Sequence, residues 1–431
     1  MSAVGVATRR TFQSLRVRNY RLYFTAQLIS NSGTWMDRVA QAWLVLHLTG
    51  SGFDLGLVTG LQFLPMLLFG PWGGLVADRV NKRRLLYFTQ AGGGLIALAL
   101  GLLVETHAIR LWQLFLLAFL LGVTNLFDNP ARQTFVFEMV GKEDLPNAVS
   151  LNSVVMNASR VIGPAVGGVV ITVVGLGVCF LANAASFLAV LVALALMRTS
   201  ELHTIAPVVR AKGQLRDGLR YVWRTPSLRN TLIAMAVIGI FAYNFQVTLA
   251  LLATVTFHGG AGSYAVLTSC MGVGAIAGGL TVAHRGRPTP RLLQGVALTF
   301  GALLAVVAVA PSLALAAVVI VFMGAASIAF IATANAELQL QADPAMRGRV
   351  MALYSMAFLG STPIGGPLIG AISEWTNPRV SLAVGAIATL LSAGILRWRH
   401  RAGQAATVAK SSGHALAPDV EPTGEVATEV A

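Results

Sequence analysis

The chain is poor in charged residues, and this scarcity excludes an ordinary soluble fold. Only 11% of its 431 residues are Asp, Glu, Lys or Arg, whereas 55% are hydrophobic. Soluble globular domains carry about 25% charged residues. A composition this apolar indicates a protein that resides in a membrane.

Cysteine is nearly absent, and neither Cys179 nor Cys270 lies outside an apolar segment. Two such cysteines supply neither a disulfide framework nor a metal-ligand spacing. None of the seven histidines has a partner at the i, i+4 spacing of metal ligands, and the glycine run at residues 92–94 lacks the Lys-Ser/Thr of a phosphate-binding loop. These absences argue against an enzyme, against ATP as the energy source, and against a metal or other cofactor.

Long apolar segments dominate the rest of the chain. Each approaches the roughly 20 residues that cross about 30 Å of hydrocarbon as a helix. Twelve are predicted, at residues 20–47, 53–77, 85–104, 111–138, 145–173, 176–197, 228–256, 263–283, 291–310, 313–340, 346–374 and 379–398. The predicted fold class is therefore an all-α membrane protein with twelve transmembrane helices.

The basic residues lie almost entirely on one side of these spans. Of the 31 lysines and arginines, 26 fall in alternate loops or at the termini, and only Arg110 and Arg379 fall on the other side. Because basic loops stay cytoplasmic, both termini are predicted to face the cytoplasm. The net charge of +14 does not indicate nucleic acid, since a nucleic-acid binder clusters its basic residues on a soluble face. Anionic membrane lipids are the expected partners of these loops.

The longest internal hydrophilic stretch, from Arg198 to Arg229, separates two sets of six spans. The N-terminal residues are basic and lack a cleavage site, so the first span is expected to serve as an uncleaved signal anchor. The C-terminal tail has no periodicity and is expected to be disordered. The predicted organisation is a cytoplasmic segment 1–19, a six-helix bundle 20–197, a cytoplasmic loop 198–227, a second six-helix bundle 228–398 and a disordered cytoplasmic tail 399–431.

The two halves are related in sequence. A shift of 202 residues aligns residues 150–153, Ser-Leu-Asn-Ser, with residues 352–355, Ala-Leu-Tyr-Ser, and places Gly168 on Gly370. Parallel six-span repeats are typical of transporters in which two bundles move about a central site. The second half is therefore expected to repeat the fold of the first.

Two motifs resemble those of a known family. Residues 74–83, Gly-Leu-Val-Ala-Asp-Arg-Val-Asn-Lys-Arg, resemble the cytoplasmic loop motif G-x-x-x-D-R-x-G-R-[RK] of the major facilitator superfamily. Asn81 replaces a glycine there, and the turn is expected to survive because Asn tolerates a positive φ. Residues 159–168 are similar to the G-x-x-x-G-P-x-x-G-G motif of proton-coupled exporters, with Ser159 in place of the first glycine. The matching positions are Gly74, Asp78, Arg79, Lys82 and Arg83 in the loop and Gly163, Pro164, Gly167 and Gly168 in span five.

The resemblance extends over about residues 15–400, and residues 128–133 and 347–354 look like the branch that contains enterobactin-type siderophore exporters and some macrolide and tetracycline pumps. It implies a monomer in a bacterial inner membrane that exports a small molecule, a siderophore or an amphiphilic drug, in exchange for protons. It also implies a cavity lined mostly by spans one, four, seven and ten. The carboxylate of Asp78 would lie against the cytoplasmic start of span eleven as a conformational switch, because helix N-terminal amides favour negative charge. The alternatives are an uptake or facilitative transporter, or a transport-inactive sensor or scaffold.

Charges inside the spans are costly and mark candidate sites. Asp37, Arg38 and Gln41 lie in span one, and Asp37 and Arg160 lie roughly 24 Å and 22 Å from the cytoplasmic entries of their helices at 1.5 Å per residue. Similar depth allows the two to meet as a proton-coupling site. The alternative is a static ion pair of Asp37 with Arg38 or with Arg160. The remaining candidates are Asp128 and Arg132, which can pair at i, i+4 in span four, and Asn157 on the polar face of span five.

The charge bias predicts a topology that epitope tags test directly. Tags at Gly213 and after His414 should be cytoplasmic, and a tag at Gly260 should be external. A protease that cleaves the Gly213 tag in intact cells would contradict the predicted orientation.

Overall fold

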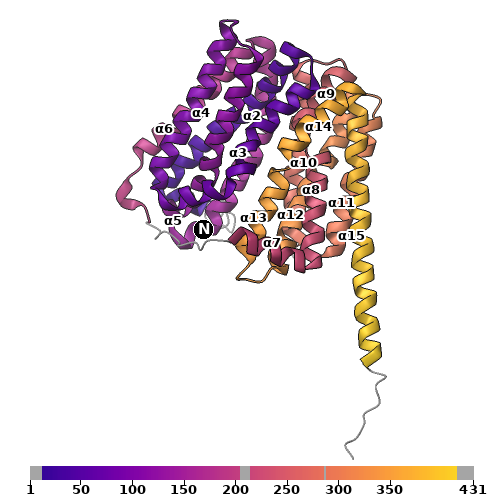
Figure 1. The fold of residues 1–431 in the computed structure, drawn as a ribbon. Helices are drawn as coiled ribbons and strands as arrows, with labels where there is room; N and C mark the ends of the chain where they lie inside the picture. Colours follow the sequence, from indigo (N-terminus) through magenta and orange to yellow (C-terminus); the bar gives the residue numbers. More distant parts are fainter. Residues whose placement is uncertain (1–11, 204–213, 286–287, 415–431) are drawn as a thin grey trace, which may run out of the picture.

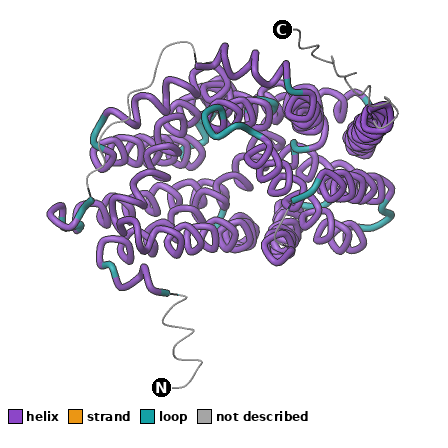
Figure 2. Tube along the Cα trace, turned by 90° about the horizontal axis from the view of Figure 1, so that it is seen from below, coloured by secondary structure: helices purple, strands orange, loops and turns teal. Residues whose placement is uncertain are grey.

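The computed structural model describes residues 12–203, 214–285 and 288–414, and every regular element in these ranges is a helix (Figure 2). The elements are η1 Gln13–Arg16, α2 Arg18–Thr49, α3 Gly52–Arg79, α4 Lys82–Glu105, α5 Leu111–Val173, α6 Leu176–Leu196, η2 Thr199–Glu201, α7 Gln214–Arg224, α8 Pro226–Ala242, α9 Phe245–Leu251, η3 Leu252–Thr256, α10 Ala261–Arg285, α11 Pro290–Val309, α12 Leu313–Gln341, α13 Arg347–Leu359, α14 Thr362–Trp375 and α15 Pro378–His414.

The described residues cross the membrane twelve times. Ten helical segments are long and apolar enough to span it, and α5 is one of them although it has 63 residues. Gly141 in α5 adopts φ 71° and ψ −172°, a left-handed conformation that favours glycine, and the chain reverses there. Both arms of α5, residues 111–140 and 142–173, contact α2. Phe135 packs on Tyr23, and the Ala148 carbonyl accepts a hydrogen bond from the Tyr20 hydroxyl. The twelfth crossing is α2, which has 32 residues but is more polar than the other ten segments.

The crossings form two bundles of six, which confirms the predicted fold class. Helices α2 to α6 make the N-terminal bundle, and α8 to α15 make the C-terminal bundle (Figure 1). The start of α2 and the end of α15 lie at the same end of the molecule, which we call the terminal face. The far end is called the opposite face. The exact limits of the bundles as domains stay a prediction.

Most described contacts between the bundles lie toward the opposite face. A Cβ built on Gly52 of α3 would lie 2.8 Å from the Gly370 carbonyl oxygen of α14, so the two backbones touch there. The Glu374 carboxylate accepts hydrogen bonds from the Ser51 hydroxyl at 2.6 Å and the Phe53 amide at 3.0 Å. In Figure 1 the bundles come together at the upper end and separate toward the terminal face. The structure is closed at the opposite face.

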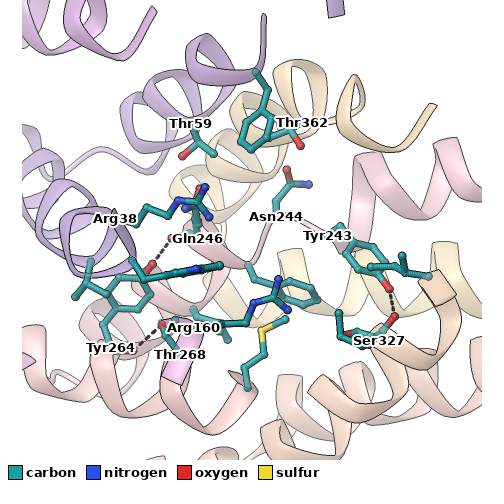
Figure 3. A pocket seen from close by; sticks show the side chains of 18 of the residues that line it. Arg38, Thr59, Arg160, Tyr243, Asn244, Gln246, Tyr264, Thr268, Ser327 and Thr362 are labelled. Atoms are coloured by element: carbon teal, nitrogen blue, oxygen red, sulfur yellow. Dashed lines mark hydrogen bonds between the residues drawn. The ribbon is translucent and has the colours of Figure 1, made fainter. Parts of the chain in front are cut away.

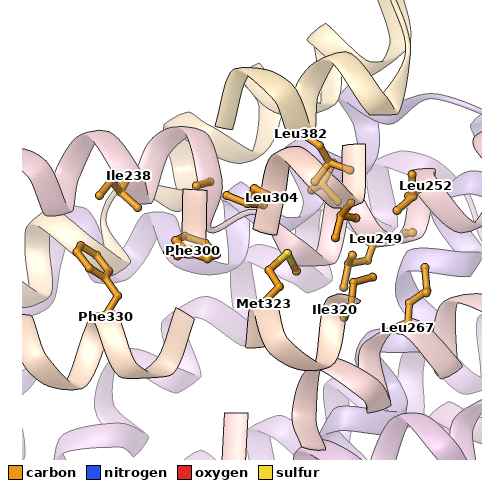
Figure 4. Packing of buried hydrophobic residues seen from close by; sticks show 14 of the residues in the cluster. Ile238, Leu249, Leu252, Leu267, Phe300, Leu304, Ile320, Met323, Phe330 and Leu382 are labelled. Atoms are coloured by element: carbon orange, nitrogen blue, oxygen red, sulfur yellow. The ribbon is translucent and has the colours of Figure 1, made fainter. Parts of the chain in front are cut away.

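The buried apolar residues form two clusters, and only one of them is confined to a single bundle. One cluster runs through both bundles and includes Val39 and Leu55 as well as Phe300, Met323 and Phe330 of the C-terminal bundle (Figure 4). A second cluster, around Tyr20, Phe135 and Met139, belongs to the N-terminal bundle alone near the terminal face. Lipid is as apolar as these side chains, so close packing rather than water exclusion provides the stabilisation.

Two local expectations were wrong. Residues 399–414 are not disordered but continue α15 to His414, beyond the rest of the bundle in Figure 1; residues 415–431 lie outside the described part. Several alanines follow Arg401, and no proline lies between Arg401 and Pro418, so the helix continues. Asn81 adopts φ −63° rather than a positive φ. Its side chain accepts a hydrogen bond from the Arg84 amide at 3.0 Å and thereby caps α4.

Glu374→Gln should weaken the closure at the opposite face, because the neutral amide is a poorer acceptor for the α3 donors than the carboxylate. Spin labels at His107→Cys and Gly260→Cys, in a protein without Cys179 and Cys270, report the separation of the two bundles. We expect the distance distribution to broaden toward longer distances relative to the parent protein. The control Glu105→Gln neutralises an exposed acid of the same face. An unchanged distribution in Glu374→Gln would show that this contact does not hold the bundles together.

Candidate functional site

A cavity of about 210 Å³ lies between the bundles, near the middle of the helices. Its polar lining residues are shown in Figure 3 and are Arg38, Thr59, Arg160, Tyr243, Asn244, Gln246, Tyr264, Thr268, Ser327 and Thr362. They come from spans one, two, five, seven, eight, ten and eleven. The expectation of spans one, four, seven and ten was therefore partly wrong, because span four contributes none of the lining residues.

Arg38 and Arg160 bring two positive charges to the cavity and share one aromatic ring. Their guanidinium carbons lie 4.4 Å and 5.1 Å from the ring centroid of Trp35, within the range of cation–π attraction. The described ion pairs include neither arginine, and no acidic residue of the described chain lines the cavity. The Nε of Arg160 is buried and has no hydrogen-bond partner among the described residues. The cavity therefore holds cationic donors without an anionic partner.

The cavity wall on the C-terminal side is a break in span seven. Helix α8 ends at Ala242 and α9 begins at Phe245, which leaves Tyr243 and Asn244 outside regular helix. The Tyr243 hydroxyl donates to the Ser327 carbonyl at 2.7 Å, and its ring lies 5.0 Å from that of Phe358. The buried Oδ1 of Asn244 has no partner in the described structure. This wall presents flat apolar surface beside a polar atom that is free to bind a ligand.

Asp37 does not meet Arg160, so the predicted pairing is wrong. Asp37 lies in a second, small cavity of about 20 Å³ inside the N-terminal bundle, with Gln41 and Asn183. Its carboxylate is hydrogen-bonded to the Asn183 side chain and feels the charge of Arg38. Successive helical residues point about 100° apart at 3.6 residues per turn, so Arg38 faces the central cavity and Asp37 faces away from it.

Asp128 and Arg132 form the predicted i, i+4 ion pair, but at a distance from the cavity. Arg132 donates to one Asp128 oxygen from Nε at 3.0 Å and from Nη2 at 2.5 Å. Thr89 and Gln90 of α4 donate to the other oxygen, both at 2.7 Å. Arg132 also donates to the side chain of Gln27 at 2.7 Å. The pair ties α2, α4 and the first arm of α5 together and leaves neither charge free.

The cations of the loop motif hold helix ends of the N-terminal bundle. Lys82 pairs with Glu138 at 3.4 Å, and Arg83 donates to the Leu194 carbonyl at the end of α6 at 2.6 Å and 2.9 Å. Gly74 and Arg79 belong to the last turns of α3. The side chain of Asp78 lies outside the described part of the structure, so its contact with span eleven stays a prediction.

The exporter-type motif in span five shapes the cavity through close packing. Gly163 lies against α2, where a Cβ would meet the Ser32 carbonyl oxygen at 2.6 Å, and this approach brings Trp35 to the second arm of α5. Pro164 and Gly167 are buried in the same contact, whereas Gly168 faces Ala265 of α10 across the bundles. Asn157 donates to its own helix at Ser153 and does not line the cavity.

Several cavity residues carried no signal in the sequence. Trp35, Tyr243 and Tyr264 are aromatic residues of a kind common in membrane spans, so the sequence does not mark them as site residues. Only the fold brings them together around the cavity. Asn244 was visible as a polar residue in an apolar span, but the helix break beside it was not. Arg38 and Arg160 were recognised because charge is rare inside hydrocarbon.

Two six-helix bundles around a central polar cavity, with a broken helix in its wall, are the architecture of a membrane transporter rather than of an enzyme. The chain belongs to the transmembrane secretion effector family of the major facilitator superfamily, whose model matches residues 9–426.

Three relatives illustrate the range of this family. The chain is 32% identical to the staphyloferrin A transporter of Staphylococcus aureus over 41% of the chain and 45% of the relative. It is 26% identical to the multidrug efflux pump Tap of Mycolicibacterium fortuitum, over 82% and 88%. It is 26% identical to the enterobactin exporter EntS of Shigella flexneri, over 86% and 89%. The chain thus spans less than half the length of the first of these.

A solved structure has the same fold. The nucleoside transporter NupG superposes with a TM-score of 0.71 over 88% of this chain and 98% of the other, at 11% sequence identity. At that identity the likeness concerns the fold alone.

Asp128→Asn should destabilise the N-terminal bundle, because it leaves the half-buried Arg132 without its counter-charge. Breaking a buried pair costs about 3–5 kcal/mol. We expect a lower yield of folded protein and a lower Tm in detergent. The double variant Asp128→Asn/Arg132→Gln removes both charges and should recover part of the loss. A single variant as stable as the parent would contradict the structural role of the pair.

Proposed function

We propose that the protein is a secondary active transporter that exports a small molecule from a bacterial cell by alternating access. The observation that carries the proposal is the central cavity, which lies between two bundles joined mainly at the opposite face. Such a cavity is exposed first to one side of the membrane and then to the other as the bundles rock.

The export direction is supported by the relatives. Tap is named an efflux pump and EntS an exporter, and each aligns with more than four fifths of this chain. The substrate class carried over from these names is a siderophore or a drug. Both termini are cytoplasmic in this proposal, because 26 of 31 basic residues lie on that side. The structure then represents a state open toward the cytoplasm. The proposed active unit is a monomer surrounded by lipid.

Asp37 is the proposed proton-coupling residue. It is 6% exposed, and the described ion pairs leave its carboxylate without a salt bridge. The cavity beside it has a volume of about 20 Å³, which is the size that one water molecule requires, and Thr34, Gln41 and Asn183 are the other polar residues of an otherwise apolar lining. A water molecule in that place delivers protons to a carboxylate that is otherwise sealed in the bundle. Asp128 is less suited, because its two carboxylate oxygens already accept four hydrogen bonds from Thr89, Gln90 and Arg132.

The alternative functions make different predictions. An uptake symporter moves protons in the same direction as the substrate, whereas an exporting antiporter moves them in opposite directions. A facilitator or a transport-inactive sensor shows no coupled proton movement. The presence and direction of the coupled proton flux therefore separate export, uptake and the functions without proton coupling.

Asp37→Asn should abolish proton movement coupled to the substrate, because the amide does not titrate. The measurement uses proteoliposomes with a pH-sensitive dye and enterobactin, staphyloferrin A or tetracycline as the test substrate. We expect at least a tenfold loss of proton flux at unchanged protein yield, while downhill substrate exchange continues.

The matched control is Glu143→Gln, which neutralises an exposed acid and should leave the proton-to-substrate ratio unchanged. A wild-type ratio in Asp37→Asn would exclude Asp37 as the coupling residue. Parallel movement of protons and substrate in the wild type would replace export by uptake.

A further inference from the structure

We infer that the central cavity binds an organic anion, with a carboxylate or phenolate held between Arg38 and Arg160 and a planar apolar body against the aromatic wall. The inference deepens the proposed function, because it assigns a substrate class to the same cavity. A cavity of this kind would bind cationic amphiphiles poorly.

The charge of the cavity is the first argument. Its described lining contains two arginines and no acid, so its formal charge is +2. The nearest carboxylate in sequence, Asp37, faces the other cavity with Asn183; its charge reaches Arg38 but it forms no ion pair with either arginine. The two guanidinium groups lie on one tryptophan and therefore near each other, so they repel. An anion between them relieves this repulsion, whereas a cation increases it.

The hydrogen-bonding capacity of the arginines is the second argument. A guanidinium has five N–H donors arranged as a fork that matches a carboxylate. The contacts of both guanidinium groups with Trp35 are cation–π contacts, which do not require a hydrogen-bond acceptor and therefore leave the N–H donors unpaired. The Nε of Arg160 is buried and unpartnered among the described residues, which is costly unless a ligand accepts its hydrogen bond. Asn244 adds another such polar atom on the opposite wall.

The apolar part of the lining indicates the rest of the ligand. Phe63, Phe245 and Phe358 line the cavity together with Trp35 and the two tyrosines. The ring of Tyr243 contacts both Phe245 and Phe358, so this wall is continuous. Flat aromatic surfaces favour a planar ring stacked or edge-on beside them. A compact aromatic acid satisfies both halves of the cavity.

The test compares three probes of equal shape and different charge: naphthalene-2-carboxylate, 2-naphthamide and 2-naphthylmethylammonium. Binding to the purified full-length protein in detergent is measured by calorimetry. We expect the carboxylate to bind at least tenfold more tightly than the amide, and the ammonium not to bind. Arg38→Gln and Arg160→Gln should each weaken carboxylate binding about tenfold without changing the affinity for the amide. Arg224→Gln, an exposed arginine of α7, is the matched control and should have no effect.

Arg38→Lys and Arg160→Lys keep the charge but remove the fork, and they should fall between the wild type and the glutamine variants. Equal or tighter binding of the amide or ammonium probe would overturn the inference, as would a folded protein that does not bind the carboxylate. Carboxylate binding without any transport would leave the anion site standing and refute the proposed function. Proton-coupled transport of another substrate without carboxylate binding would refute the anion site and leave the proposed function standing.

Discussion

A charge inside hydrocarbon requires compensation, and the three arginines of the spans are compensated in different ways. Arg132 is neutralised by a buried carboxylate and fixes three helices of one bundle. Arg38 and Arg160 form no ion pair among the described residues. Both lie over Trp35 and repel each other, and Arg38 alone also feels the charge of Asp37. A protein retains such a weakly compensated pair only where something else supplies negative charge. The contrast separates a structural site from a binding site within one bundle.

Much of the fold follows from apolar length and basic loops, because hydrocarbon imposes both. A chain reversal between residues 138 and 145 and the twelve crossings were predictable in this way, whereas the position of the reversal at Gly141 was not. The position of Asp37 relative to Arg160 was not predictable. The depth of a residue in the membrane follows from its number along the helix, but the direction of its side chain depends on how the helix is rotated against the neighbouring helices. Asp37 and Arg38 lie at almost the same depth but in different cavities. The helix break at Tyr243 depends on packing around Phe300 and Phe358 and likewise had no local signal.

If the ligand is an anion, the membrane potential contributes to the driving force for its export. One elementary charge that crosses a membrane potential of 100 mV exchanges about 2.3 kcal/mol with it. An inside-negative potential favours the outward movement of an anion, so export of an acid is assisted before any proton is exchanged. A proton that enters through Asp37 adds to this driving force. The charge of the cavity and the proposed direction of transport are therefore consistent with each other.

The most direct measurement is an experimental structure of the protein with naphthalene-2-carboxylate bound. The account predicts density for the carboxylate within about 3 Å of both guanidinium groups, with the naphthalene ring against Phe245 and Phe358. Density for the probe outside the central cavity, or Arg38 and Arg160 paired with an acidic side chain of the protein, would contradict it.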